Sequence, residues 1–512
     1  MLEPLEWETD ILGEGARLFL DADFRFAELP EALTGRRFIR SNHFGTRKVC
    51  LQAGVAYAIT PARGQGRLSR AEQLEHLGFR QAAVPVVRII SGGRAVDCSV
   101  YQKRLRESER IDFGSPGLAL TPEVPWCVFV AAAPSTAGSV GSSSSSFPAR
   151  NPFSPPLAQS YTVAAEVPDH LKYFIHDPGM VRLPSGSFLV AAPCWQRRVG
   201  PDHLMMARSA DGGRNWQRLP DLPFAEGTPF VVGDDLYMFT QPRQHQDVYF
   251  MRSDDEGETW TGPVKVVEGA FWNCQTNMVI REGQLYWVLD QKHKATVAIA
   301  ADLSEDLLDP GAWRISQVIA AKQTAVQFRT AHDDHQPERF DDWNLEGNVM
   351  DVNGRLRIAC RVNPKHTGTT PGIAAVFDLK DDGVNLNLRF DQHHPWPGGQ
   401  SKFCIVYDEL TRLFWMACNL ISSAEPQRLD SGPNAERRLL MLYCGMDGLN
   451  WLPAGCVAMA PCSSQSFMYP SVAIDGDDLA ILSRTCRNSG HYHDADLATF
   501  HRVHSFRELA WH

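Results

Sequence analysis

The segments Ser209-Ala-Asp-Gly-Gly-Arg-Asn-Trp216 and Ser253-Asp-Asp-Glu-Gly-Glu-Thr-Trp260 share one pattern, Ser-x-Asp-x-Gly-x-(Thr/Asn)-Trp, and begin 44 residues apart. The pattern is typical of a hairpin turn, in which Ser and Asp side chains bind backbone N–H groups and glycine supplies a positive φ angle. The tryptophan is expected to fold beneath the turn as an apolar plug. Recurrence at this interval indicates a repeat architecture, so the motif predicts a scaffold and not an activity.

A second repeat consists of an apolar run, a tight turn and another apolar run, with alternating polarity along each run. A further strand follows most copies, and a shortened relative of the Asp motif, Met446–Trp451, follows the fifth. Six four-stranded units in roughly 350 residues predict an all-β fold, a six-bladed β-propeller over residues 161–512. The six hairpins are Gly179–Val190, Gly227–Thr240, Asn277–Val288, Gly347–Ile358, Phe403–Trp415 and Ser471–Leu482.

The N-terminal part reads as a separate domain. Residues 132–160 form a Ser- and Pro-rich linker, a composition typical of a flexible connection. Residues 1–131 contain short β-rich runs and one amphipathic segment, Ser69–Leu77, that predicts a helix. We expect a small β-rich (α+β) accessory domain there, with a substrate-binding role and a structural role both open.

Composition excludes several classes of function. A net charge of −10 provides no basic tract for nucleic acid, and no apolar run is long enough to span a membrane. The acidic N-terminus lacks a signal pattern, which predicts a cytoplasmic protein. The 12 cysteines show no zinc spacing, so we expect reduced thiols, no metal and no cofactor. The short clusters His332–His335 and His491–Asp494 are more typical of solvated loops, and the oligomeric state stays open.

In a propeller the innermost strand of each blade runs along the central axis, so residues just before these strands gather at one end of the hub. In this chain those positions are polar or ionisable, a composition that suits a small polar ligand. The predicted ring consists of His176, Asp177, Glu226, Gln275, Glu346, Lys402 and Tyr469.

The propeller region resembles the sialidase (neuraminidase) superfamily, six-bladed propellers whose Asp-box (BNR) repeats match the Ser-x-Asp-x-Gly-x-(Thr/Asn)-Trp segments. In that superfamily a glutamate polarises a tyrosine nucleophile, three arginines hold the substrate carboxylate, and an aspartate is the acid/base. The resemblance implies that Glu346 and Tyr469 are the glutamate and the tyrosine. It implies that Arg361, 15 residues after Glu346, is the second arginine, and that Arg437 or Arg438 is the third.

Two positions depart from the superfamily pattern. The Arg-Ile-Pro signature of the first blade reads Ile175-His-Asp-Pro178, so His176 replaces the first arginine. Arg197 and Arg198 occupy the stretch that should carry the acid/base aspartate. We therefore expect His176, Asp177 or Asp202 to donate the proton.

Three functions fit this pattern, and all bind an oligosaccharide or glycoconjugate. The first is an exo-acting glycoside hydrolase on an acidic sugar. Its nucleophile is Tyr469, its base is Glu346, and its proton donor is His176 or Asp177. Arg361, Arg437, Arg438, Glu226, Gln275 and Lys402 bind the substrate.

The second function is that of a propeller polysaccharide lyase or rhamnose–glucuronate hydrolase, in which His176 leads and Tyr469 assists. The third is glycan binding without catalysis, through sugar stacking on tryptophans. The candidates for that stacking are Trp195, Trp272, Trp343 and Trp396.

Overall fold

The computed structural model describes residues 9–16, 24–39, 48–51, 54–62, 70–91, 94–106, 109–112, 128–130, 155–197, 202–292, 295–324, 344–362, 372–421, 437–460, 465–488 and 493–510. The chain forms two compact units, Met1–Phe153 with Asn488–Tyr492 and Ser154–Arg487 with His493–His512. All ten predicted site residues lie in the described part of the second unit. The predicted linker lies outside the described residues except for residues 155–160.

The first unit is built on an eight-stranded sheet of order β1-β3-β10-β5-β8-β7-β2, with β6 paired to β8, and a separate β4–β9 ladder. Helix α1, Ala71–His76, lies within the predicted segment Ser69–Leu77 and buries Ala71 and Leu74. The strands are β1 Thr9–Ile11, β2 Phe24–Glu28, β3 Arg37–Ile39, β4 Lys48–Leu51, β5 Gly54–Pro61, β6 Arg80–Gln81, β7 Val87–Ser91, β8 Arg94–Leu105, β9 Glu109–Asp112 and β10 Val128–Val130.

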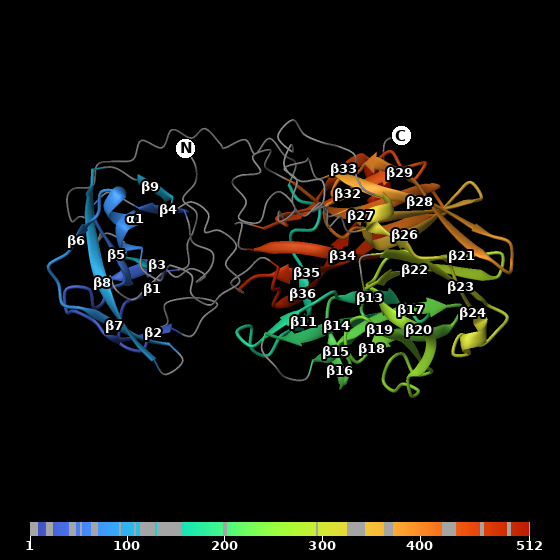
Figure 1. Cartoon of the computed structure of the whole chain (residues 1–512), viewed down its shortest axis with the longest axis horizontal. Helices are drawn as coiled ribbons and strands as arrows, with labels where there is room; N and C mark the ends of the chain where they lie inside the picture. The colour runs from blue at the N-terminus through green and yellow to red at the C-terminus, as the bar shows by residue number, and fades with distance from the viewer. Residues whose placement is uncertain are drawn as a thin grey trace. The chain divides into compact units, whose positions relative to one another are not determined.

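The second unit is almost entirely β-structure, arranged as a propeller of antiparallel sheets around a common centre (Figure 1). Its first half contains β11 Thr162–Glu166, β12 Tyr173–Ile175, β13 Gly179–Arg182, β14 Phe188–Gln196, β15 His203–Ser209, β16 Gln217–Leu222, β17 Glu226–Val232, β18 Asp235–Gln241, β19 Gln246–Ser253, β20 Val264–Trp272, β21 Val279–Arg281, β22 Gln284–Gln291, β23 Ala295–Asp302, β24 Trp313–Ile315 and β25 Ile319–Ala320. Its second half contains β26 Asn344–Val352, β27 Arg355–Val362, β28 Ile373–Asp381, β29 Leu386–Pro395, β30 Cys404–Asp408, β31 Leu413–Leu420, β32 Leu439–Gly445, β33 Leu452–Met459, β34 Ser466–Asp475, β35 Asp478–Cys486 and β36 Leu497–Val503.

All six predicted hairpins are present, as β13–β14, β17–β18, β21–β22, β26–β27, β30–β31 and β34–β35. The first strands of these hairpins contact one another around the centre, where β13 touches both β17 and β34, and β30 touches both β26 and β34. The second and third hairpins belong to one nine-stranded sheet, because Phe271 and Trp272 of β20 pair with the end of β22.

The second strand of a hairpin packs between neighbouring sheets and is buried on both faces. Strands β22 and β31 are buried along nearly their whole length, and their central Trp287 and Trp415 are fully enclosed. The outer strand β16 is instead mostly exposed, and Leu219 is its one buried residue. The apolar runs of the sequence therefore mark the inner layers of the sheets.

The N-terminal strand of this unit completes the last sheet. Strand β11 pairs with β36, so residues from both ends of the propeller share one sheet with β34 and β35. Just before it, Leu157 and Ala158 donate backbone bonds to the β33 carbonyls of Cys456 and Val457, and Ala158 is buried. Residues 155–160 thus pack on the propeller and do not act as linker.

The two Asp motifs form the expected turns. Asp211 accepts bonds from the backbone of Arg214 and Asn215, and Gly213 donates to the Ser209 hydroxyl. These bonds, led by the one from the Asn215 backbone, lower the pKa of Asp211 to about 2. The second turn repeats the arrangement around Asp255.

Candidate active site

The predicted ring residues lie at or just before the first strands of the hairpins, and most are buried. Their positions are equivalent in successive hairpins, so the repeat delivers them to one end of the hub. His176 and Asp177 lie between β12 and β13, Glu226 opens β17, Gln275 precedes β21, Glu346 lies in β26, Lys402 precedes β30, and Tyr469 lies in β34.

Glu346 and Tyr469 adopt an uncommon backbone conformation. Their φ angles are +59° and +51°, in the left-handed region that non-glycine residues rarely occupy. Each lies at a β-bulge, where the register with the return strand shifts. Bulges redirect a side chain out of the regular pleat, and strain of this kind persists where the surrounding structure requires it.

Arg361 joins these two residues. Its Nη1 donates to the Glu346 carboxylate at 2.9 and 3.2 Å and to the Tyr469 hydroxyl at 3.2 Å, and its Nε donates to the Gln400 carbonyl at 3.0 Å. Burial raises the pKa of Glu346, although the adjacent Arg361 opposes the shift. Glu346, Arg361 and Tyr469, three residues of the predicted site, are therefore in contact in the structure.

His176, Asp177 and Glu226 form a second cluster. His176 Nδ1 lies 3.4 Å from a Glu226 oxygen and 3.5 Å from an Asp177 oxygen, and its ring stacks on Trp195 at 3.9 Å. Burial by itself would lower the pKa of His176, but the two carboxylates outweigh it and raise the pKa. Burial also raises the pKa of Glu226.

Arg484 connects the two clusters, and the sequence analysis did not identify it. Its guanidinium donates to Asp177 at 3.5 Å, donates to the backbone carbonyl of His493, and lies 5.1 Å from the centre of the Tyr469 ring. His493 Nε2 lies 3.5 Å from the Tyr469 hydroxyl. Arg484, on the return strand of the last hairpin, therefore contacts both Asp177 and Tyr469.

The sequence analysis did not identify Asp290 either, although its position near the end of a return strand is visible in the sequence. The return strand of a hairpin ends at the same end of the hub as the first strand begins, and five such strands carry a buried polar residue within their last three positions. Asp290 accepts the backbone N–H of Glu346 at 3.0 and 3.1 Å and so supports the bulge. Burial raises its pKa well above the ordinary value. The five strand-end residues are Gln241, Asp290, Arg361, Asn419 and Arg484.

Lys402 and Gln275, two residues of the predicted ring, differ in their burial and in their hydrogen bonds. Lys402 is fully buried and donates to the Pro470 carbonyl at 2.6 Å, directly beside Tyr469. Gln275 is partly exposed, and its Oε1 has no hydrogen-bond partner in the described structure. An unsatisfied polar atom of this kind favours a bound polar group.

The two candidates for a third arginine differ. Arg437 is buried, and its carbonyl accepts the backbone N–H of Phe467, two residues before Tyr469. Arg438 instead donates to the carbonyl of Ala460 at the end of the outer strand. The backbone bond to Phe467 places Arg437, rather than Arg438, next to the tyrosine strand.

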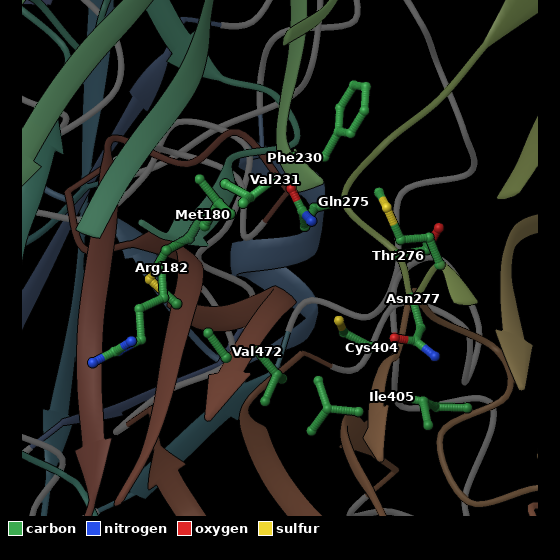
Figure 2. Close-up of a pocket in the computed structure, with 14 residues that line it drawn as sticks. Met180, Arg182, Phe230, Val231, Gln275, Thr276, Asn277, Cys404, Ile405 and Val472 are labelled. Atoms are coloured by element: carbon green, nitrogen blue, oxygen red, sulfur yellow. The ribbon is translucent and has the colours of Figure 1, made fainter. Parts of the chain in front are cut away.

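A cavity of about 290 Å³ is lined by residues of β13, β17, β30 and β34 and by the segment that precedes β21. Figure 2 shows these side chains. Met180, Ile405 and Val472 make much of its wall apolar, while Gln275 and Asn277 contribute amides. Because Gln275 also belongs to the ring, this cavity adjoins the candidate site.

The remaining residues that the sequence suggested for the site differ in where they lie. Trp195 stacks on His176 beside the second cluster, whereas Trp396 is buried against Phe403 in the core. Trp343 lies outside the described residues, as do His332–His335 and His491. Asp202 accepts the backbone N–H of Gln196 and contacts neither cluster in the described structure.

The described residues contain no group of three His, Cys, Asp or Glu side chains arranged to hold a metal ion. Within the same part of the chain, no helix is long and apolar enough to cross a membrane.

No protein-family model matches the sequence, and no curated protein is significantly similar to it. Solved structures with a similar fold include an α-L-arabinanase from Penicillium chrysogenum complexed with arabinobiose, with 12% identity over 69% of this chain and 100% of that one (TM-score 0.43). A Trypanosoma rangeli sialidase has 14% identity over 69% of this chain and 58% of that one (TM-score 0.43). NanB sialidase from Streptococcus pneumoniae has 9% identity over 91% and 98% (TM-score 0.43). Likeness at this level concerns the fold and carries no argument about activity, which rests on the side chains.

Proposed function

We propose that the second unit is a six-bladed propeller acting as an exo-glycoside hydrolase on an acidic sugar at the end of an oligosaccharide or glycoconjugate. The nine-stranded sheet counts as two blades joined through β20 and β22. The observation that carries the proposal is the contact of Arg361 with both Tyr469 and Glu346 at two strained bulges.

Tyr469 is the nucleophile in this proposal. An ordinary phenol, with a pKa of about 10, is a poor nucleophile at neutral pH. Arg361 lies 3.2 Å from the hydroxyl and Arg484 lies 5.1 Å from the ring centre, so two positive charges face the phenol. Cations in a buried site stabilise negative charge that develops during attack. Glu346 holds Arg361 in place and is the predicted proton acceptor.

His176 supplies the proton in this proposal. Because its pKa is raised by Asp177 and Glu226, the imidazolium is available near neutral pH as a general acid. Tyr469 bonds to the anomeric carbon as its proton passes to the predicted acceptor Glu346, the bond from that carbon to the leaving oxygen breaks, and His176 protonates that oxygen. Water then attacks the same carbon, His176 takes a proton from the water, and the bond to Tyr469 breaks as Glu346 returns the proton to the tyrosine oxygen.

Arg361, Arg437 and Arg484 favour an acidic sugar, since guanidinium groups bind carboxylates in a defined geometry. Glu226, Gln275 and Lys402 then contact hydroxyl groups of the sugar.

Hydrolysis of fluorogenic glycosides tests the proposal. An α-sialoside, a β-glucuronide and the neutral α-L-arabinofuranoside are compared for the wild type, Y469F and the control Y407F. Tyr407 is 36% exposed and lies on β30 away from the bulges. We expect turnover of an acidic glycoside that falls by at least about 10³-fold in Y469F, the scale of losing a nucleophile, and is unchanged in Y407F.

Equal turnover by Y469F and the wild type would remove Tyr469 from the reaction. Turnover of the arabinofuranoside alone would support a hydrolase activity but contradict the proposal that the substrate is an acidic sugar.

A second candidate is a lyase acting on uronic-acid polysaccharides. It is favoured by His493, 3.5 Å from the Tyr469 hydroxyl, and by Arg484, which links Tyr469 to Asp177 next to His176. A lyase releases an unsaturated uronide that absorbs in the ultraviolet, whereas a hydrolase product does not. Absorbance of digests of uronic-acid polymers therefore separates the two reactions.

A further inference from the structure

The hydrogen-bond partners of His493 decide which of its ring nitrogens carries a hydrogen. Arg484 Nη2 lies 3.5 Å from His493 Nδ1. Arginine has no acceptor atom and can only donate, so this contact makes Nδ1 the acceptor of the ring. The hydrogen of the neutral imidazole is therefore on Nε2. If the ring takes up a second proton, Nε2 keeps its hydrogen, so this nitrogen is a donor in both states.

His493 Nε2 lies beside the Tyr469 oxygen. The two atoms are 3.5 Å apart, and the two rings meet edge to face with centroids 5.9 Å apart. Arg361 Nη1 donates to the same oxygen from 3.2 Å. The Tyr469 oxygen therefore faces two N–H donors, and neither of them can take its proton. That proton remains available to the predicted acceptor Glu346.

We propose that His493 is a catalytic residue that donates a hydrogen bond from Nε2 to the Tyr469 oxygen and so stabilises the phenolate; this inference rests on the proposed function. A hydrogen bond to the charged form of a group favours that form. Hydrogen bonds between catalytic groups are often long without substrate and shorten when it binds. His493 neither gains nor loses a proton in this role.

Arg484 holds His493 in the orientation that this role needs. Its guanidinium is fully buried, donates to the His493 backbone carbonyl and also reaches Nδ1 of the same residue. It lies 5.1 Å from the centre of the Tyr469 ring, where its positive charge favours the phenolate. Arg484 is thus a positioning residue that orients the imidazole and keeps the hydrogen on Nε2.

The other charged groups near His493 do not reverse the direction of this hydrogen bond. Asp494 Oδ1 lies 4.0 Å from Nδ1 and favours an imidazolium, whereas the Arg484 charge opposes it. Arg197 pairs with Asp494 and weakens its effect. Because Nε2 carries a hydrogen in either state, these charges alter the strength of the donor and leave it a donor.

The ionisation of Tyr469 in the full-length protein tests this role without any glycoside. Tyrosine labelled with ¹³C at Cζ gives one NMR signal for each residue, and that signal moves when the hydroxyl ionises. The signal that is lost in Y469F belongs to Tyr469. The pH at the midpoint of its movement is compared for the wild type, H493A, H493Q and the control H504A, whose histidine is 75% exposed.

We expect the midpoint to lie about one pH unit higher in H493A, the size of losing one hydrogen bond to a charged group. Glutamine keeps an N–H donor without the ring, so H493Q should recover most of this difference. H504A should have the wild-type midpoint. Recovery by glutamine is an effect that a purely structural role of the imidazole would not show.

An unchanged midpoint in H493A would overturn the proposal. A lower midpoint would overturn it as well, because loss of a group that accepts a hydrogen bond from the hydroxyl favours ionisation. The same rise in H493Q as in H493A would also contradict a donor role. Because the measurement needs no turnover, a failure of the proposed hydrolase activity is a separate outcome.

Discussion

Tyr469 and Glu346 occupy the same place in two different hairpins. Each lies at a bulge with a positive φ, +51° and +59°. Each is followed 15 residues later on the return strand by an arginine, Arg484 and Arg361. Two hairpins thus share the same arrangement of a bulged residue and an arginine on the return strand. Arg361 connects the two hairpins by binding both Glu346 and Tyr469.

The bulge at Glu346 depends on the glycine that follows it. A Cβ atom at Gly347 would lie 2.7 Å from Val288 Cγ1 and 3.0 Å from Cys360 Sγ. We expect G347A to lower the free energy of unfolding by about 1–3 kcal/mol and to reduce turnover. Urea unfolding checks this, with G262A as control because nothing lies within 4 Å of its added Cβ. Equal midpoints for the two variants would contradict it.

The buried pair of Arg361 and Glu346 should show strong coupling. R361M leaves the Glu346 charge buried without its partner, at an expected cost of about 3–5 kcal/mol. The double variant R361M/E346Q should cost less than the two single changes together, by about 1 kcal/mol or more. A cycle on the exposed pair Arg88–Glu28 should give coupling below about 1 kcal/mol. Additive effects at Arg361 and Glu346 would contradict the prediction.

His176 should make stability depend on pH in a defined direction. Its pKa is raised in the folded protein, so its contribution is fully present below the ordinary value of 6.5 and is lost as pH rises through the raised pKa. The difference in unfolding free energy between wild type and H176Q should therefore be largest below pH 6.5 and shrink as the pH rises above that value. Urea unfolding across this range measures it, with H504Q as control. A difference that grows with pH would contradict the assignment.

Asp211 should make stability depend on pH in the opposite direction to His176. Its pKa is lowered to about 2, so the stability it contributes is present above the ordinary value of 3.8 and is lost as pH falls toward 2. Thermal unfolding of D211A and wild type should differ near neutral pH and converge in acid. D254A serves as control, because that carboxylate is 72% exposed and forms an ion pair with Arg252 on the surface. A constant difference across the range would exclude the turn bonds as the cause.

The repeated hairpins were readable from the sequence because their determinants are local. Alternating apolar residues and turn glycines predicted the six strand pairs, and their first residues predicted the ring. The sequence did not predict the bulges at Glu346 and Tyr469, because neither glutamate nor tyrosine is typical of a positive φ angle. Arg484 and Asp290 lie near the ends of return strands, whereas the predicted ring consists of residues where the first strands begin, so neither belonged to it.

The sequence by itself determined the hairpin scaffold and the set of polar residues at strand ends, since alternation and turn chemistry act over a few residues. Only the tertiary structure decided which of these residues meet. Asp177 contacts Arg484 across 307 positions of the chain, and Arg361 contacts Tyr469 across 108. Both contacts join residues of different sheets, so they form only when the sheets are packed around the hub.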